Sequence, residues 1–169
     1  MGAMALRWYT VVVDSRDPSS LARWWAETLG WVIVFETDEE VVVVPSGADI
    51  APRETLDDWL TEGQGLVFVP VPEGKTIKNR LHLDLAPHTT QDRDAEIAAL
   101  LERGATHVEI GQSDAAEGAV TWTVLADPEG NEFCVLSSRN RCLNRSVRRA
   151  NAATVRPARS RSRGRSNPW

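Results

Sequence analysis

The sequence predicts an α+β fold made of two tandem βαβββ modules. Residues 6–71 show the periodicities of one strand, one helix and three strands, and residues 80–138 repeat this order. Both predicted helices begin at an aspartate and end at a glycine, which are common cap residues. A sheet with a helix on one face leaves its other face uncovered. We therefore expect the two modules to pair as a cup-shaped mixed sheet enclosing a cleft.

The first module opens with a predicted strand over residues 6–13. Asp17 and Pro18 favour a helix start, and Gly30 favours its end. The helix places Leu21, Trp24, Trp25 and Thr28 on one face at i, i+3, i+4 and i+7 spacing.

Three further strands complete the first module. Residues 31–36 and 41–44 predict a hairpin around the turn 37–40. Residues 66–71 are the closing strand. Between them, residues 56–60 predict one helical turn around Trp59, which we consider as a lid or a dimer contact.

The second module has the same plan. Residues 80–86 predict a strand and residues 92–103 a helix ending at Gly104. The apolar residues of that helix are Ile97, Leu100 and Leu101. The remaining predicted strands are 106–110, 120–126 and 132–137, and the turn Asp-Pro-Glu-Gly-Asn at 127–131 joins the last two.

Charge divides the chain into two parts. All 24 acidic residues lie at or before Glu132. Residues 1–138 contain nine lysines and arginines. Residues 139–169 contain ten arginines and no acidic residue. We expect a folded domain over residues 1–138 and a disordered basic tail. The tail is alternatively a weak nucleic-acid contact or a segment that docks on its own acidic domain.

No segment predicts export or membrane insertion. The longest apolar runs, 31–35 and 41–44, are too short to span a bilayer, and the N-terminus lacks a secretion pattern. Cys134 and Cys142 have neither metal-type nor disulfide-type spacing. We therefore expect a cytoplasmic protein without membrane contact.

The strand at 80–86 contains the most informative residues. If Leu81, Leu83 and Leu85 pack on one face, His82 and Asp84 point together from the other. His82 is then a hydrogen-bonded core residue, a residue that positions a ligand, or a general acid–base whose ring the neighbouring Asp84 carboxylate holds in place.

Several segments together resemble glyoxalase-like proteins of the vicinal oxygen chelate superfamily, which also contains bleomycin-resistance proteins and extradiol dioxygenases. These segments are residues 12–18 and 22–31, residues 71–85, and residues 127–136. The resemblance covers about residues 6–138. It implies paired βαβββ modules around a cup-shaped cavity.

The resemblance also implies four metal-ligand positions, which fall on Thr10, Val69, His82 and Cys134. Val69 cannot bind a metal, and threonine is a poor ligand. His82 and Cys134 offer two ligands, fewer than the three of catalytic zinc, and Asp84 is not a standard chelating partner two residues from His82. We expect no metal and no other cofactor.

We predict that the protein binds a small organic ligand, as proteins of the bleomycin-resistance kind do. We also predict that it is a homodimer. The predicted ligand-binding residues are Trp8, Thr10, Arg80, Asp84, Trp122 and Cys134. An alternative is a metal-independent lyase or isomerase with His82 as its acid–base, so enzyme activity stays open. A third hypothesis is nucleic-acid binding through the tail.

Overall fold

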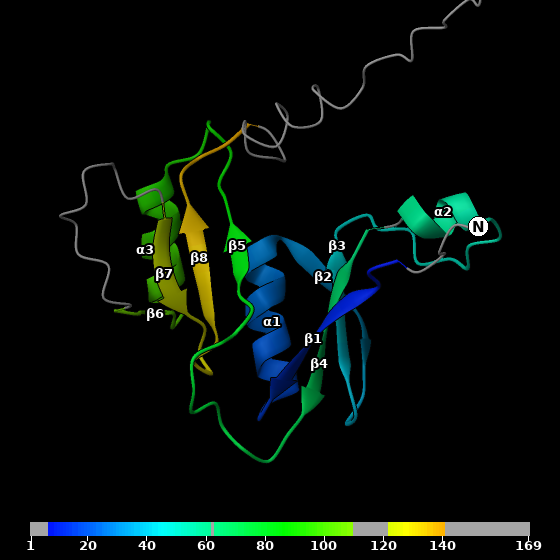
Figure 1. The fold of residues 1–169 in the computed structure, drawn as a ribbon, viewed down its shortest axis with the longest axis horizontal. Coiled ribbons are helices and arrows are strands. Elements are labelled where there is room, and N and C mark those ends of the chain that lie inside the picture. The colour runs from blue at the N-terminus through cyan, green and yellow to red at the C-terminus, as the bar shows by residue number, and fades with distance from the viewer. Residues whose placement is uncertain (1–6, 62, 110–121, 141–169) are drawn as a thin grey trace, which may run out of the picture. The chain divides into compact units, whose positions relative to one another are not determined.

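A computed structural model describes residues 7–61, 63–109 and 122–140, and it contains two four-stranded mixed sheets (Figure 1). By its contacts the chain divides into Met1–Ser138 and Arg139–Trp169. The predicted order or disorder of the tail lies outside the described residues. The strand predicted at 106–110 is shorter than expected, because it ends at His107 and residues 108–109 are not in a strand.

The first sheet belongs to the N-terminal module and has the strand order β1-β4-β3-β2. β1 and β4 are parallel, and the other pairs are antiparallel. Its elements are β1 (Thr10–Ser15), α1 (Pro18–Leu29), β2 (Trp31–Glu36), β3 (Val41–Pro45), α2 (Leu56–Thr61) and β4 (Gly65–Pro70).

The second sheet repeats this topology in the C-terminal module, with the order β5-β8-β7-β6. β5 and β8 are again parallel. Its elements are β5 (Leu83–Leu85), α3 (Arg93–Glu102), β6 (Thr106–His107), β7 (Trp122–Ala126) and β8 (Glu132–Leu136). The predicted α+β fold class with tandem βαβββ modules is confirmed.

Helix α1 begins and ends where its local sequence predicts. The Asp17 side chain accepts a hydrogen bond from the Ser20 amide, and Pro18 occupies the first turn. Gly30 closes the helix with φ at 64°, a left-handed conformation that suits glycine. Because these signals are local, the sequence alone predicts this helix.

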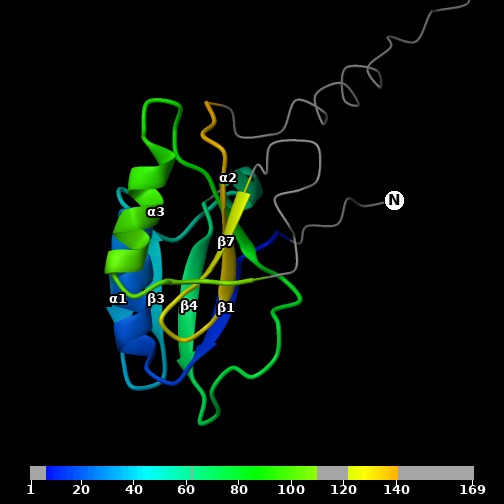
Figure 2. The same cartoon turned by 90° about the vertical axis from the view of Figure 1, so that its left-hand side faces the viewer.

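The two modules share one hydrophobic core. Trp24 and Trp25 of α1 pack edge-on against Phe133 of β8, with ring centroids 5.9 and 5.3 Å away. The Trp25 Nε1–H also donates to Asp127, and the Trp24 Nε1–H donates to the Arg103 carbonyl. Figure 2 shows α1 and α3 on the same side of the molecule. The first helix therefore stabilises the second module as well as its own.

The turn at 127–131 also connects the modules. The Glu129 carboxylate accepts hydrogen bonds from the Ser15 hydroxyl at 2.8 Å and from the Arg16 and Asp17 amides at 2.9 Å. Ser15 is fully buried. The sequence predicts this segment only as a turn, and the contact with the start of α1 is an additional finding.

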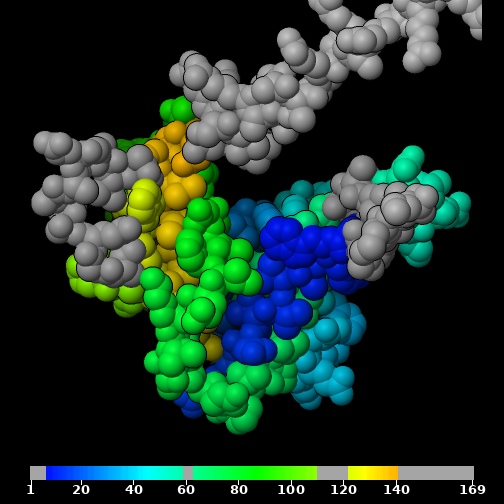
Figure 3. Space-filling view, in the orientation of Figure 1, coloured from blue at the N-terminus to red at the C-terminus, as the bar shows by residue number. Residues whose placement is uncertain are grey.

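The strand predicted at 80–86 is shorter than expected. β5 covers only Leu83–Leu85, and the Leu81 side chain is 89% exposed rather than packed with Leu83 and Leu85. The parallel ladder with β8 begins at the pair Leu83–Phe133, so Leu81 lies before the first paired residue. In the space-filling view β5 lies between the N-terminal strand and the closing strand (Figure 3).

The start of the first strand also differs from prediction, because β1 begins at Thr10 and leaves Trp8 outside the ladder. Among the described residues, no helix is both long and apolar enough to cross a membrane.

Candidate functional site

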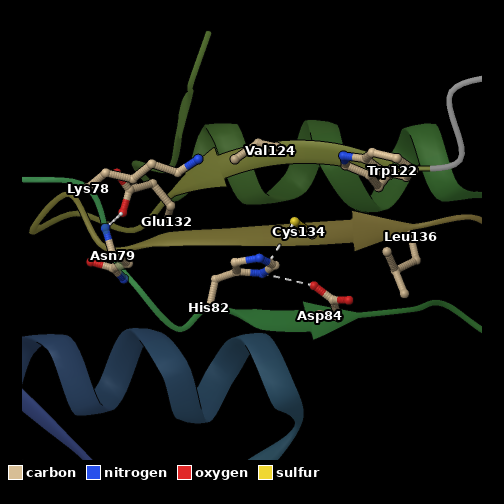
Figure 4. A pocket seen from close by; sticks show the side chains of 9 residues that line it. All are labelled: Lys78, Asn79, His82, Asp84, Trp122, Val124, Glu132, Cys134 and Leu136. Carbon is tan, nitrogen blue, oxygen red and sulfur yellow. Dashed lines mark hydrogen bonds and ion pairs between the residues drawn. The ribbon is translucent and has the colours of Figure 1, made fainter. Parts of the chain in front are cut away.

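The uncovered face of the second sheet contains a pocket of about 400 Å³ (Figure 4). We call it the His82 pocket. Its polar lining residues are Lys78, Asn79, His82, Asp84, Glu132 and Cys134. Its apolar lining residues are Trp122, Val124 and Leu136. The pocket therefore combines an apolar wall with charged and hydrogen-bonding groups.

Strand register explains why these side chains meet. Cys134 of β8 pairs with Asp84 on one side and with Val124 on the other. Directly paired residues point to the same face of a sheet, so all three line the pocket. The intervening residues Phe133 and Val135 point to the opposite face and are buried in the core.

Three side chains form a close polar cluster in the pocket. His82 Nδ1 lies 3.1 Å from the Asp84 Oδ1 and 3.7 Å from the Cys134 Sγ. Figure 4 shows the imidazole between the carboxylate and the thiol. His82 precedes β5, so its side chain is not fixed by the strand ladder and turns toward both partners.

The Cys134 thiol is a weak nucleophile at neutral pH. Burial, and then the negative charge of Asp84, raises its pKa to about 11, and the nearby Lys78 offsets only part of this. A thiolate is the reactive form of cysteine. The free thiol is thus suited to hydrogen bonding rather than to covalent catalysis.

Glu132 lies at the Lys78 end of the pocket and is already paired. Its carboxylate lies 2.9 Å from the Lys75 Nζ and accepts a hydrogen bond from the Asn79 amide. Burial acts to raise the pKa of Glu132, but the Lys75 and Asn79 contacts outweigh it and the pKa is lowered. This contact holds the loop before β5 against the start of β8.

Lys78 is a cation available to a ligand. Figure 4 shows its side chain extending toward Val124 of β7. Within the described part of the chain, no hydrogen-bond or ion-pair partner is found for its amine. A charged amine over an apolar wall can contact an acidic group on a bound molecule.

The uncovered face of the first sheet has its own pocket, of about 410 Å³. Its floor contains the valines at positions 34, 42, 44 and 67. Thr10 lines it too, and its hydroxyl donates to the Gly65 carbonyl at 2.9 Å. We call it the valine pocket.

The structure brings together only some of the predicted site residues. His82, Asp84, Trp122 and Cys134 share one pocket, whereas Thr10 lines the other. The Trp8 side chain is 64% exposed, and its Nε1–H donates to the Thr10 carbonyl.

Arg80 is exposed and is not part of the His82 pocket. Lys78 lines that pocket in its place. Sequence reasoning also missed Asn79, Val124, Glu132 and Leu136. For the last three, the signal was the alternation of residues on the two final strands.

The four metal positions implied by the family pattern do not fit a shared centre. Thr10 and His82 line different pockets, and the Thr10 hydroxyl is already bonded to the backbone. Val69 offers only a hydrocarbon side chain. A four-ligand metal centre built from both modules is therefore incompatible with these residues.

Several solved structures have a similar fold. One is a glyoxalase/bleomycin resistance protein/dioxygenase family enzyme from Burkholderia phytofirmans, with 15% identity and a TM-score of 0.55 over 79% of this chain and 100% of that chain. A second, from Sphaerobacter thermophilus, belongs to the superfamily of the same name, with 19% identity and a TM-score of 0.52 over 80% and 100% of the two chains.

A third is TnmS3, an antibiotic-binding protein from a Streptomyces species, with 21% identity and a TM-score of 0.50 over 81% of this chain and 100% of that chain. At these identities the likeness extends to the fold alone. No curated protein matches the chain in sequence.

A family model gives the assignment directly. The model of the glyoxalase-like domain matches residues 10–136, which include the eight strands of the described residues and the whole lining of the His82 pocket. This range covers most of the chain and agrees with the repeated βαβββ topology. The chain belongs to the glyoxalase-like domain family.

Proposed function

We propose that this protein binds a small organic molecule in the His82 pocket. The observation that carries the proposal is the composition of the pocket, in which Trp122, Val124 and Leu136 form an apolar wall and the amine of Lys78 reaches the Val124 end of it. Mixed linings of this kind are typical of small-molecule sites. The ligand that fits best has a planar apolar body and one acidic group.

Binding of this kind needs no catalytic metal. Stacking on an indole and apolar burial hold the body of the ligand, and the lysine selects its charge. The antibiotic-binding TnmS3 is a precedent for small-molecule binding on this fold.

The test uses 2-naphthoate and its neutral amide as probes, with affinity measured by fluorescence titration. We expect the naphthoate to bind more tightly, and Trp122→Ala and Lys78→Met to weaken it at least ~10-fold. Lys78→Met should also remove the preference for the acid. The matched controls, Trp8→Ala and Arg80→Met, change residues outside the pocket and should leave affinity unchanged. Equal effects of control and pocket variants would refute the proposal.

A second candidate function is metal-independent lyase or isomerase chemistry. The observation that favours it is the 3.1 Å contact between His82 and Asp84, which orients the imidazole toward the pocket. Turnover of a carbonyl substrate that survives removal of metals and is lost in His82→Gln would support it. Turnover unchanged in His82→Gln would exclude His82 as the acid–base.

We also propose that the protein is a cytoplasmic homodimer. The uncovered valines of the first sheet, including the exposed Val12, Val32 and Val34, support pairing because exposed apolar patches often mark interfaces. Sedimentation of the unchanged protein and of the Val32→Lys variant distinguishes a dimer from a monomer. A monomer at micromolar concentration would contradict dimer formation.

A further inference from the structure

The Asp84 carboxylate decides which nitrogen of the His82 imidazole carries the proton. Nδ1 of His82 lies 3.1 Å from Oδ1 of Asp84, and an ionised carboxylate can only accept a hydrogen bond. A neutral imidazole has a single N–H, so this contact places it on Nδ1 and leaves a free lone pair on Nε2. Because Asp84 pairs with Cys134 in the β5–β8 ladder, the acceptor is held beside the ring by the strand backbone.

The thiol of Cys134 does not change this assignment. Its Sγ lies 3.7 Å from the same Nδ1, but the carboxylate is the stronger acceptor for that N–H. Burial, and then the charge of Asp84 and a hydrogen bond to its carboxylate, raise the pKa of the thiol to about 11. The thiol therefore stays protonated at neutral pH and is itself a donor to Asp84. Both neighbours donate to the carboxylate, and Nε2 of His82 is left open as an acceptor.

A molecule in the His82 pocket can reach this nitrogen. The His82 side chain lines the pocket and is 46% exposed. Within residues 7–61, 63–109 and 122–140, no hydrogen-bond partner is found for Nε2. In Figure 4 the amine of Lys78 extends toward Val124 of β7, whereas the imidazole lies on the β5 side. The pocket thus offers a cationic donor and a neutral acceptor at separate places.

We propose that the His82 pocket selects hydroxyaryl acids, because Nε2 of His82 accepts a hydrogen bond from the hydroxyl group of the ligand. Asp84 is the positioning residue that keeps Nε2 free of its proton. This inference rests on the proposed function and adds the class of ligand to it. Methylation of the hydroxyl keeps the acid and the rings of the ligand but removes the donor, so Nε2 loses its partner.

A panel of naphthoates tests this selectivity. The full chain is titrated by fluorescence at pH 8, at which an ordinary imidazole is mostly neutral. The probes are 2-naphthoate, its 5-, 6- and 7-hydroxy derivatives and the matching methoxy compounds, which sample the distance between acid and donor. We expect at least one hydroxy compound to bind at least ~5-fold more tightly than its methoxy partner and than 2-naphthoate.

Two histidine variants assign this preference to one residue. His82→Phe keeps a flat ring without the acceptor, so it should bring the ratio of hydroxy to methoxy affinity to about 1. His88→Phe is the matched control, because His88 lies outside the pocket and should leave the ratio unchanged. Circular dichroism of each variant checks that it is folded.

Nitrogen-15 NMR of the imidazoles tests the role of Asp84 by a readout that a merely structural residue would not move. The unchanged protein should carry the proton of His82 on Nδ1. His88 gives the opposite signature in the same spectrum, because its Nδ1 accepts from the Thr90 amide. Asp84→Ala should move His82 toward the Nε2–H form and lower the hydroxyl preference. The ratio of two acids is compared, so the lost charge affects both alike.

Three results would overturn the inference. They are equal affinities of every hydroxy compound and its methoxy partner, an unchanged ratio in His82→Phe, and a proton on Nε2 of His82 in the unchanged protein. Binding of 2-naphthoate without any hydroxyl preference would end this inference and leave the proposed function standing. Failure of every probe to bind would end both.

Discussion

The contact between Glu129 and the start of α1 makes a sharp prediction about stability. Replacing Glu129 by alanine removes the acceptor for three hydrogen bonds. Hydrogen bonds to a charged group contribute about 1.5–3 kcal/mol each, but the exposed Arg16 and Asp17 amides can bind water instead. The buried Ser15 hydroxyl loses its carboxylate acceptor, so we expect a total loss of about 2–4 kcal/mol.

Urea unfolding followed by circular dichroism measures this loss. For a folded domain of this size, each kcal/mol lowers the melting temperature by roughly 3–4 °C, so the melting temperature of Glu129→Ala should be about 6–16 °C lower. The urea midpoint should fall with the slope unchanged. Glu129→Gln keeps one acceptor oxygen and should lose about half as much.

Glu27→Ala is the matched control, because it removes an exposed glutamate from α1. It should change stability by less than about 0.5 kcal/mol. If Glu129→Ala were as stable as this control, the hydrogen bonds between the turn at 127–131 and the start of α1 would not stabilise the contact between the two modules.

Three further predictions concern charge. The pKa of Glu132 is lowered in the folded protein, so its ion pair contributes stability above its unfolded pKa of 4.5, and this is lost as pH falls through the lowered value. Glu132→Gln should therefore lose less stability than the unchanged protein between pH 7 and about pH 3 in urea titrations, and an equal loss would contradict this. In a Cys142→Ser background, alkylation of Cys134 by iodoacetamide should rise about tenfold per pH unit from pH 8 to 10, because its pKa is about 11. A plateau near pH 8.5 would disagree. If the tail binds nucleic acid, affinity should fall steeply with salt and vanish on truncation after Ser138, whereas retained binding would exclude the tail.

Features set by neighbouring residues were predictable from the sequence. The caps of α1 and the hairpin turn at 37–40 depend on local preferences, and the structure agrees with them. The grouping of Asp84, Trp122 and Cys134 in one pocket follows from strand alternation.

Features set by distant residues were not predictable. Leu81 follows the alternation of its strand but lies before the first ladder pair, so the partner strand decides its exposure. Lys78 rather than Arg80 lines the His82 pocket. Both residues lie in the loop before β5, where the alternation of side chains along a strand does not predict which way a side chain points. The role of Glu129 depends on residues more than a hundred positions away.

The tryptophan pair of α1 gives the protein an internal optical reporter. The rings of Trp24 and Trp25 are nearly perpendicular, 5.2 Å apart, and both contact Phe133 of the other module. Closely spaced indoles in a fixed, asymmetric arrangement produce a near-ultraviolet circular dichroism signal that disappears when the rings move independently. Separation of the modules can therefore be followed without a label, even under conditions in which each module keeps its own strands and helices.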